Sequence, residues 1–200
     1  MNNIAILPAR QLRAGSCFFC DQELSAIKII IGLGNPGAKF AGSRHNIGFT
    51  ILNELSNNLL FHFDTKHNFE QGNFTFLDGR QIKFLKPQTF MNLSGQILPH
   101  FLKGGLKAEQ ILVIHDELEK PLSSLGIKFS GSARGHNGLK SIIDFVGPNF
   151  WRLQFGVGRP TEKSDVSNFV LTKFAQSELV SMQETVKRAV EYFSCNHKTF

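Results

Sequence analysis

The sequence predicts an α/β fold in a single domain, built from a mixed, mostly parallel sheet with helices on both faces in three layers (α/β/α). Two short aliphatic runs, at residues 29–31 and 111–114, are typical of central strands that are buried on both faces. Stretches with apolar residues three or four positions apart, typical of amphipathic helices, alternate with the predicted strands. The length of 200 residues suits one domain with its own core.

Residues 1–26 are predicted to form a flexible N-terminal extension, and residues 27–200 a single catalytic domain. The extension has no hydrophobic periodicity, and its apolar stretch at residues 4–7 is too short for a signal peptide. Because no acidic residue precedes Asp21, an organelle-targeting segment remains the alternative. Cys17, Cys20 and Cys195 are too few for a disulfide framework, and they fit a reducing compartment. The Cys17/Cys20 pair lacks the further ligands of a structural zinc site, so we assign it no role.

The predicted elements follow one another from the strand that begins at Ile27. A glycine-rich turn and an amphipathic helix over residues 47–59 come next. Residues 74–85 suggest a hairpin that turns at Asp78 and Gly79, a dipeptide that suits tight turns. A helix around residues 97–102, the strand at 111–114, a helix over 139–146, a strand over 153–157 and a helix over 176–193 complete the chain.

The formal net charge of +6 favours a polyanionic partner. No block of five or more like charges occurs, so any basic surface must be assembled by folding from scattered residues. No apolar run approaches the roughly 18 residues that a membrane-spanning helix needs. We therefore expect a soluble, cytoplasmic protein with no membrane partner.

A candidate catalytic pair comes from two distant parts of the chain. His115, Asp116 and Glu117 follow the apolar run at 111–114, where open α/β sheets place their ligand sites. Asp116 can accept a hydrogen bond from one imidazole nitrogen of His45, and this leaves the other nitrogen free as a base. The alternative is that His45 is a surface or capping residue and that the three polar residues only end a strand.

The loop at residues 32–37 has the pattern G-x-G-x-x-G of dinucleotide-binding turns. Its final Pro-Gly favours a turn, and the acidic residue about twenty positions on, Glu54, lies within a helical pattern, so we interpret the loop differently. It is a glycine-permissive turn that presents a side-chain amide to a substrate. Three amides that both donate and accept would suit carbonyl and N–H groups: Asn35, Asn92 and Asn137.

Four motifs, in this order and spacing, resemble those of bacterial-type peptidyl-tRNA hydrolases. They are GLGNPG through RHN over residues 32–46, KPQTFMNLSG at 86–95, HDEL at 115–118 and GHNGL at 135–139. Shorter likenesses at 150–153, 156–160 and 169–171 extend the resemblance from about residue 27 to the C-terminus. The resemblance implies hydrolysis of the ester between the peptide, or an N-blocked amino acid, and the 3′ ribose of tRNA. It implies a monomer that needs no metal, no cofactor and no obligate protein partner.

The same resemblance assigns roles to individual residues. The position of His45 is that of the catalytic base, Asp116 supports it, and Asn35 helps to distinguish blocked from free aminoacyl groups. The 3′ end and acceptor stem of the tRNA are then expected to meet the remaining substrate-binding positions, which are Phe40, Phe90, Met91, Asn92, Asn137, Lys128 and Arg152.

Some positions depart from the family pattern. Phe40 stands where the family mostly has tyrosine, which removes a hydroxyl but keeps the stacking face. Ser130 and Ser132 stand in a loop that is usually rich in glycine, and Gln154 replaces an often basic residue that is associated with gripping the terminal phosphate of tRNA. Lys128, the other basic residue that the family uses there, is present. We expect this grip to be weaker, or to shift to Arg134, Lys140 or Arg152.

Three other functions fit parts of the sequence. A serine hydrolase built on Ser94 lacks the G-x-S-x-G turn. A metal hydrolase that uses His115, Asp116 and His136 lacks H-x-x-x-H spacing. An RNA-binding scaffold without hydrolytic activity would be indicated by loss of the predicted catalytic residues, all of which are present.

Overall fold

Four parallel strands form the centre of an eight-stranded sheet in the computed structural model, which describes residues 10–12, 16–18 and 22–194. The strand order is β1-β7-β8-β6-β2-β5-β4-β3. The parallel strands are β2 (Ile29–Gly32), β5 (Gln81–Pro87), β6 (Ile111–Glu117) and β8 (Trp151–Gly156). The side chains of β2, β6 and β8 are buried throughout, which explains the apolar runs of β2 and β6.

The outer strands pair antiparallel, so the predicted mixed sheet is confirmed and its parallel part is confined to the centre. On one side, β7 (Leu125–Phe129) pairs with β8, and β1 (Arg10–Gln11) pairs with β7. On the other side, β4 (Phe69–Thr75) pairs with β5, and β3 (Asp64–Thr65) pairs with β4. The predicted turn at 78–79 joins β4 to β5. Strands β1, β3 and β7 were not predicted.

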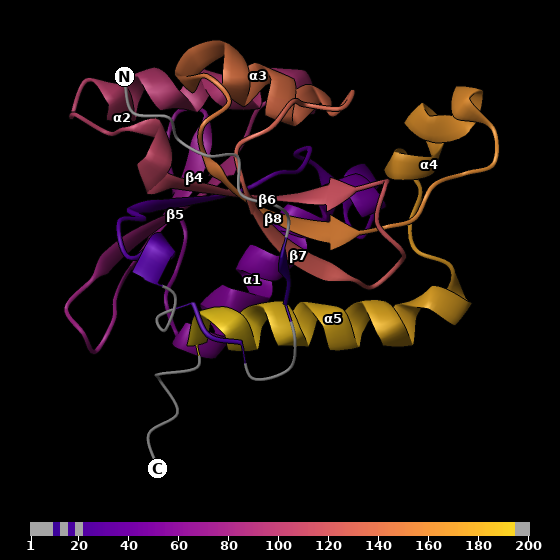
Figure 1. Ribbon diagram of the computed structural model, residues 1–200, viewed down its shortest axis with the longest axis horizontal. Coiled ribbons are helices and arrows are strands. Elements are labelled where there is room, and N and C mark those ends of the chain that lie inside the picture. The colour runs from indigo at the N-terminus through magenta and orange to yellow at the C-terminus, as the bar shows by residue number, and fades with distance from the viewer. Residues whose placement is uncertain (1–9, 13–15, 19–21, 195–200) are drawn as a thin grey trace.

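Helices cover both faces of the sheet, which confirms the three layers (Figure 1). The longest helices, α1 (Ile47–Leu59) and α5 (Gln176–Ser194), lie on one face. The 3₁₀ helix η4 (Met91–Ile97), α2 (Leu98–Leu102) and α3 (Asn137–Val146) lie on the other. Neighbouring residues of a central strand face opposite layers, so Leu112 belongs to the core under α1 and Val113 to the core under α3.

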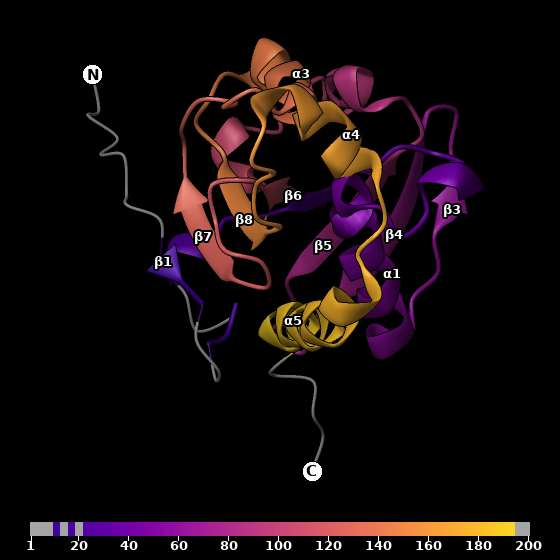
Figure 2. The same cartoon turned by 90° about the vertical axis from the view of Figure 1, so that its right-hand side faces the viewer.

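The remaining helical elements are short. Helix α4 (Val166–Leu171) stands beyond the carboxyl ends of β6 and β8 (Figures 1 and 2). Single 3₁₀ turns are η1 (Gln22–Leu24), η2 (Ala38–Phe40), η3 (Arg44–Asn46), η5 (Ala108–Gln110) and η6 (Lys163–Asp165). No helix in the described part of the chain combines the length and the apolarity that a membrane span requires.

The predicted extension at residues 1–26 falls partly outside the described residues, which leave out 1–9, 13–15 and 19–21. The residues of this segment that are described include Leu12, Phe18 and Leu24, whose side chains are buried. The ring of Phe18 packs against Tyr192 and Phe193 of α5, with ring centroids 6.0 and 5.2 Å away. Cys17, to which the sequence assigned no role, is disulfide-bonded.

Candidate active site

The predicted site forms where β2 and β6 end side by side. Gly32 pairs with Ile114 in parallel register, so the loop after β2 and the residues that end β6 leave the sheet at the same edge. Helix α1 starts across both strand ends. A Cβ atom at Gly48 would lie 2.6 Å from the carbonyl oxygen of Ile114, so glycine permits this close approach. The turn η3, which carries His45, is thereby held against β6.

His45 and Asp116 meet as predicted. The Nδ1 atom of His45 lies 2.9 Å from Oδ1 of Asp116. The side chain of Asp116 is 2% exposed and that of His45 is 11% exposed, so the carboxylate is enclosed while the ring retains access to solvent. Such a pair can orient an imidazole for proton transfer.

A second imidazole, from His136, binds the same carboxylate oxygen. Its Nε2 lies 3.0 Å from Asp116 Oδ1. Its Nδ1 caps α3 and accepts the backbone N–H groups of Gly138, at 3.1 Å, and Leu139, at 3.4 Å. Since Nδ1 is an acceptor, the neutral ring carries its hydrogen on Nε2 and donates it to Asp116. The sequence considered His136 only as a metal ligand; its place shortly before the helix predicted at 139–146 was the signal for a cap.

Asp116 is held as a carboxylate by these two rings. Burial raises the pKa of Asp116, but the charge interactions and hydrogen bonds with His45 and His136 outweigh burial and lower the pKa well below its usual range. Because the ionised carboxylate can only accept, His45 donates through Nδ1. Its Nε2 lone pair is then available to take a proton.

The same three side chains could be considered as a metal site, because their ligand atoms lie within 4.8 Å of one another. The bonding around His136 argues against this use. If Nε2 coordinated a metal, the ring hydrogen would move to Nδ1, where it would face the two N–H groups that begin α3. The donor set therefore fits proton transfer better than metal binding.

Asn35 is locked in one orientation by its neighbours. The side chain of Asn46 accepts the backbone N–H of Asn35 and donates to its carbonyl oxygen, both at 2.9 Å. The side-chain oxygen of Asn35 accepts the N–H of Met91 at 2.8 Å, which leaves the Nδ2 hydrogens as donors for a ligand. The role of Asn46 was not predicted, although it belongs to the RHN motif.

Aromatic and amide side chains border this loop. Phe90 is 58% exposed, and its ring stands edge-on to half-buried Phe40, with centroids 6.5 Å apart. Asn92 and Asn137 are exposed, and Asn137 lines one cavity together with His45. Met91 is buried, so its part in the site is to hold Asn35 through the backbone.

A cavity of about 280 Å³ leads from His45 toward a basic cluster. Burial and the charges of Arg134 and Arg152 lower the pKa of Lys128, as expected where like charges are crowded. Arg152 is buried and donates to the carbonyl oxygens of Ser132, at 2.7 Å, and Gly131. Burial lowers the pKa of Arg152 to about 10. Arg152 therefore supports the 131–132 loop, while Lys128 and Arg134 are the more accessible cations.

Three of the positions that depart from the family pattern, Ser130, Ser132 and Gln154, lie at this cavity or beside it. Gln154 donates to Oε2 of Glu117 at 2.7 Å, so it is bonded to an acidic side chain of the cavity wall. Ser130 has a φ of 61°, a conformation that favours glycine. Its hydroxyl donates to Asn149 at 2.9 Å, which ties the loop to the residues before β8.

Ser94 cannot serve as an accessible nucleophile. Its side chain is fully buried, and its hydroxyl donates to the carbonyl oxygen of Met91 at 2.9 Å. The geometry thus disfavours the serine hydrolase alternative.

Comparison with known proteins agrees with this geometry. A family model described as "Peptidyl-tRNA hydrolase" matches residues 29–199. The peptidyl-tRNA hydrolase of Fervidobacterium nodosum is 39% identical over 175 residues, which cover 82% of this chain and 87% of that protein. The one from Desulfitobacterium hafniense is 40% identical over 169 residues, covering 82% and 90%. The crystal structure of peptidyl-tRNA hydrolase from Acinetobacter baumannii superimposes with a TM-score of 0.79 at 35% identity, covering 84% of this chain and 86% of that one. The chain therefore belongs to the peptidyl-tRNA hydrolase family and is an enzyme of that class.

Proposed function

We propose that His45 activates a water molecule to hydrolyse the ester between the peptide, or an N-blocked amino acid, and the 3′ ribose of tRNA. The observation that carries this mechanism is the carboxylate oxygen of Asp116, which accepts hydrogen bonds from His45 and from His136. It fixes the Nδ1–H tautomer of His45, so that Nε2 is the base.

The reaction needs no covalent enzyme intermediate. Nε2 of His45 takes a proton from water while the water oxygen attacks the ester carbonyl. The tetrahedral oxyanion then collapses, the bond to the 3′ oxygen of the ribose breaks, and the imidazolium returns its proton to that oxygen. The products are the peptide acid and tRNA with a free 3′ hydroxyl. Asp116 remains ionised and stabilises the imidazolium.

Asparagine amides supply the polar contacts to the substrate. The side-chain oxygen of Asn35 is bonded to the N–H of Met91, and its Nδ2 group is left to donate to the substrate. Asn92, the residue after Met91, is exposed next to this bond. We assign them to the developing oxyanion and to the first peptide unit, with Asn137 as a further contact. A donor to an oxyanion typically contributes about 2.7–4 kcal/mol of transition-state stabilisation.

The tRNA end meets the rim of the site. Phe40 and Phe90 present faces and edges on which unstacked bases can pack. Lys128 and Arg134 bind phosphate at the far end of the cavity, and Arg152 acts through the loop that it holds. We further propose that the enzyme acts in the cytoplasm as a monomer, with residues 27–200 as its catalytic domain.

Replacing the base tests the mechanism. We expect His45→Ala to lower kcat for an N-acetyl-aminoacyl-tRNA by about 10²–10⁴-fold, the usual contribution of a positioned general base, while binding of a tRNA 3′-end analogue is retained. Asp116→Asn should also lower kcat, because an amide can support the wrong tautomer. The matched control is His67→Ala, which truncates an exposed histidine of a loop.

Near-normal turnover by His45→Ala would refute the role of the base. Loss of wild-type activity in the presence of a chelator, with recovery on adding a divalent metal, would instead favour the metal arrangement. The role of Asn35 is tested by comparing turnover of N-acetylated and free aminoacyl-tRNA in Asn35→Ala. We expect this variant to be slower and to lose the preference for the N-acetylated substrate.

A further inference from the structure

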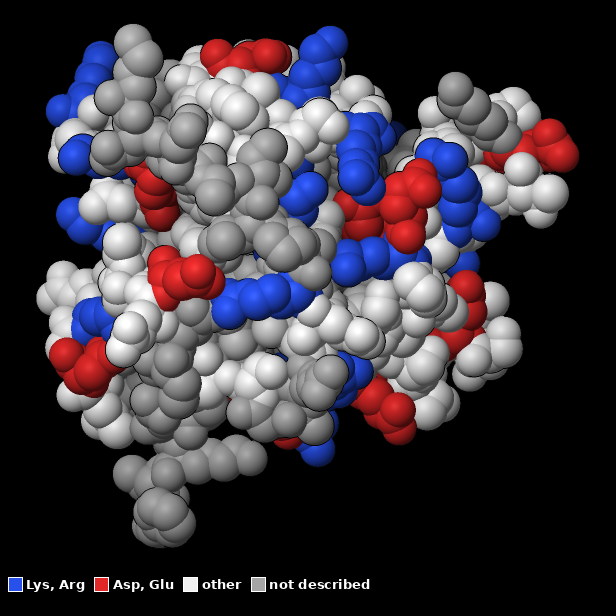
Figure 3. All heavy atoms as spheres, viewed as in Figure 1, with Lys and Arg blue, Asp and Glu red and all other residues white. Residues whose placement is uncertain are grey.

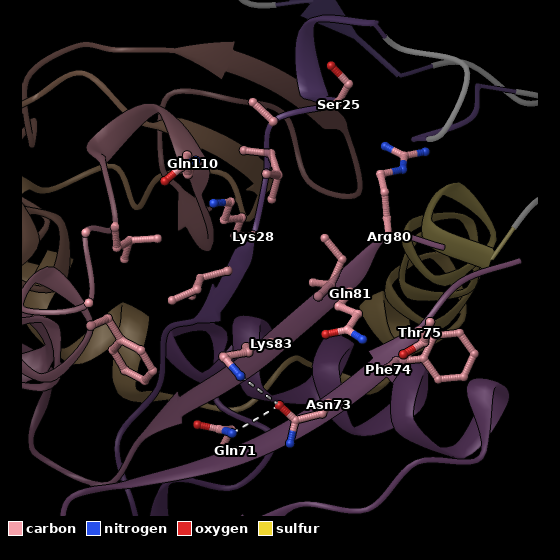
Figure 4. Close-up of a pocket in the computed structure, with 18 of the residues that line it drawn as sticks. Ser25, Lys28, Gln71, Asn73, Phe74, Thr75, Arg80, Gln81, Lys83 and Gln110 are labelled. Carbon is pink, nitrogen blue, oxygen red and sulfur yellow. Dashed lines mark hydrogen bonds between the residues drawn. The ribbon is translucent and has the colours of Figure 1, made fainter. Parts of the chain in front are cut away.

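A second and larger hollow, drawn in Figure 4, lies at the edge of the sheet where the parallel strands begin. Its volume is about 1030 Å³. It is lined where the parallel strands begin, by Lys28 before β2, by Gln81 at the start of β5 and by Gln110 before β6. The catalytic residues stand at the carboxyl ends of the same strands. Nothing in the proposed mechanism uses this edge.

The hollow exists because helices cover only part of one sheet face. In β5, Ile82 and Phe84 point into the core beneath α1, whereas Gln81 and Lys83 are exposed on the other side. Their cross-strand partners in β4 are Thr75 and Asn73, which are also exposed. Helix α2 packs further along strands β4 and β5, over Leu85 and Phe69, and leaves the polar residues at this end of the two strands uncovered.

The lining is basic. Lys28, Arg80 and Lys83 face the hollow, and none of the described residues that line it is an aspartate or glutamate. Arg80 is paired with Asp78 at 2.7 Å. Neither Lys28 nor Lys83 has a carboxylate partner within the described residues, and Lys83 contacts only the amide oxygen of Asn73, at 3.4 Å. Two lysines at the start of neighbouring strands therefore present unneutralised charge.

The other lining groups are suited to the edges and faces of nucleobases. Side-chain amides both donate and accept, and Gln71, Asn73, Gln81 and Gln110 provide four of them. Gln71 donates to Asn73 at 3.0 Å, as Figure 4 shows, which orients that pair. His100 is exposed, and its ring stands perpendicular to that of Phe101, with centroids 5.0 Å apart, so it adds an aromatic ring to the lining.

We propose that this hollow binds a strand of RNA, with phosphates at Lys28 and Lys83 and bases against His100 and the amides. Its volume of about 1030 Å³ stands at the upper end of the roughly 300–1,000 Å³ that is usual for small-molecule pockets. A charged groove combined with stacking and amide groups is the arrangement that binds single strands. This site is separate from the one that receives the ester.

The test is to titrate ¹⁵N-labelled full-length protein with oligouridylate of about eight nucleotides and to follow backbone amide shifts at several salt concentrations. The arms are wild type, Lys28→Ala/Lys83→Ala, and the control Lys66→Ala/Lys187→Ala, which removes equal charge from exposed positions elsewhere. Inorganic phosphate and a mononucleotide serve as separate ligands. Turnover of N-acetyl-aminoacyl-tRNA is measured in parallel.

We expect oligouridylate to shift the amides of Asn73, Gln81 and Lys28. In the double variant, the slope of log affinity against log salt at these signals should fall by about 1.4, which is about 0.7 for each lost phosphate contact. The control should keep the wild-type slope, and kcat should be unchanged in both variants. Shifts confined to the His45 edge, or a mononucleotide that binds as tightly as the oligonucleotide, would overturn the proposal, and neither result would affect the hydrolytic mechanism.

Discussion

At the scale of single residues, one carboxylate oxygen organises two imidazoles, and a third imidazole lies beside them. Asp116 Oδ1 accepts from His45 and His136, and the backbone N–H groups at the start of α3 determine which nitrogen His136 uses. The third ring, His115, points away: its Nδ1 donates to the backbone carbonyl of Asp116 at 2.7 Å, and its buried Nε2 has no partner among the described residues. His115 is thus held neutral beside the catalytic pair.

A neutral buried histidine makes stability depend on pH. Burial lowers the pKa of His115 from 6.5 to about 3. Between these two values the unfolded chain binds a proton that the folded chain does not, so the free energy of unfolding decreases as the pH falls from about 6.5 toward about 3. This group accounts for at most about 1.4 kcal/mol per pH unit.

We expect His115→Gln to make this pH dependence shallower, because glutamine does not titrate. Urea unfolding curves of both proteins between pH 7 and pH 4 measure the effect. His62→Gln, at an exposed histidine, should retain the wild-type slope. Parallel pH profiles for wild type and His115→Gln would show that His115 does not contribute.

At the scale of elements, the site depends on how α1 meets the strand ends. Gly48 lets the first turn of α1 lie against Leu33 and Ile114, and η3 directly before it carries the base. Arg44, in the same turn, is buried. It pairs with Glu178 at 2.6 Å and donates to the carbonyl oxygen of Lys173 at 2.8 Å. The start of α5 and the segment before it are thereby attached to the turn that holds His45.

The change Gly48→Ala should therefore damage both stability and catalysis. The added methyl would overlap backbone atoms of Ile114 in β6 and of Leu33, directly after β2, and overpacking of this kind typically costs about 1–3 kcal/mol of unfolding free energy. Displacing His45 by about 1 Å from Asp116 should lower kcat by up to about 10²-fold. Denaturant unfolding and turnover assays measure the two effects.

A suitable control is Gly104→Ala, at an exposed turn residue, where the nearest atom to the new methyl would be the carbonyl oxygen of Phe101 in α2, at 3.3 Å. If Gly48→Ala retained wild-type kcat, the position of η3 would not depend on this close approach.

At the scale of the whole molecule, the two sites that we propose lie at opposite edges of one sheet. The face seen in Figure 3 shows basic side chains interspersed with acidic ones, as the scattered charge of the sequence suggests. Folding nevertheless places Lys128, Arg134 and Arg152 around one cavity beside His45. Binding of the tRNA phosphates should therefore depend on salt, while the chemical step should not.

We expect kcat/KM for N-acetyl-aminoacyl-tRNA to fall as salt is raised, with kcat nearly constant. Lys128→Ala should reduce the slope of log kcat/KM against log salt by about 0.9, the value for one phosphate contact on duplex nucleic acid. Lys187→Ala, at an exposed lysine of α5, should leave the slope unchanged. A response to salt that is equal in wild type and Lys128→Ala would remove Lys128 from the phosphate contact.

Much of the fold follows from local patterns. The apolar runs predict β2 and β6, the apolar spacing predicts α1 and α5, and the turn at 78–79 predicts the hairpin. These predictions succeed because the spacing of apolar residues within an element reflects which of its faces is buried. The short strands β1, β3 and β7 were missed. Two of them have only two residues, and β7 contains a glycine, so their pairing rests on neighbouring strands and not on their own pattern.

By itself the sequence determined which side chains could do the chemistry: His45, Asp116 and Asn35 stand in motifs whose order and spacing can be read directly. Only the tertiary structure decided how they are held. Three sets of hydrogen bonds show this, and each joins residues that are not neighbours in the sequence. His136 donates to Asp116, Asn46 bonds both backbone polar groups of Asn35, and Arg152 donates to the carbonyl oxygens of the 131–132 loop. Hydrogen bonds depend on distance and direction, and for residues so far apart in the chain these are set only when the sheet and its helices have packed.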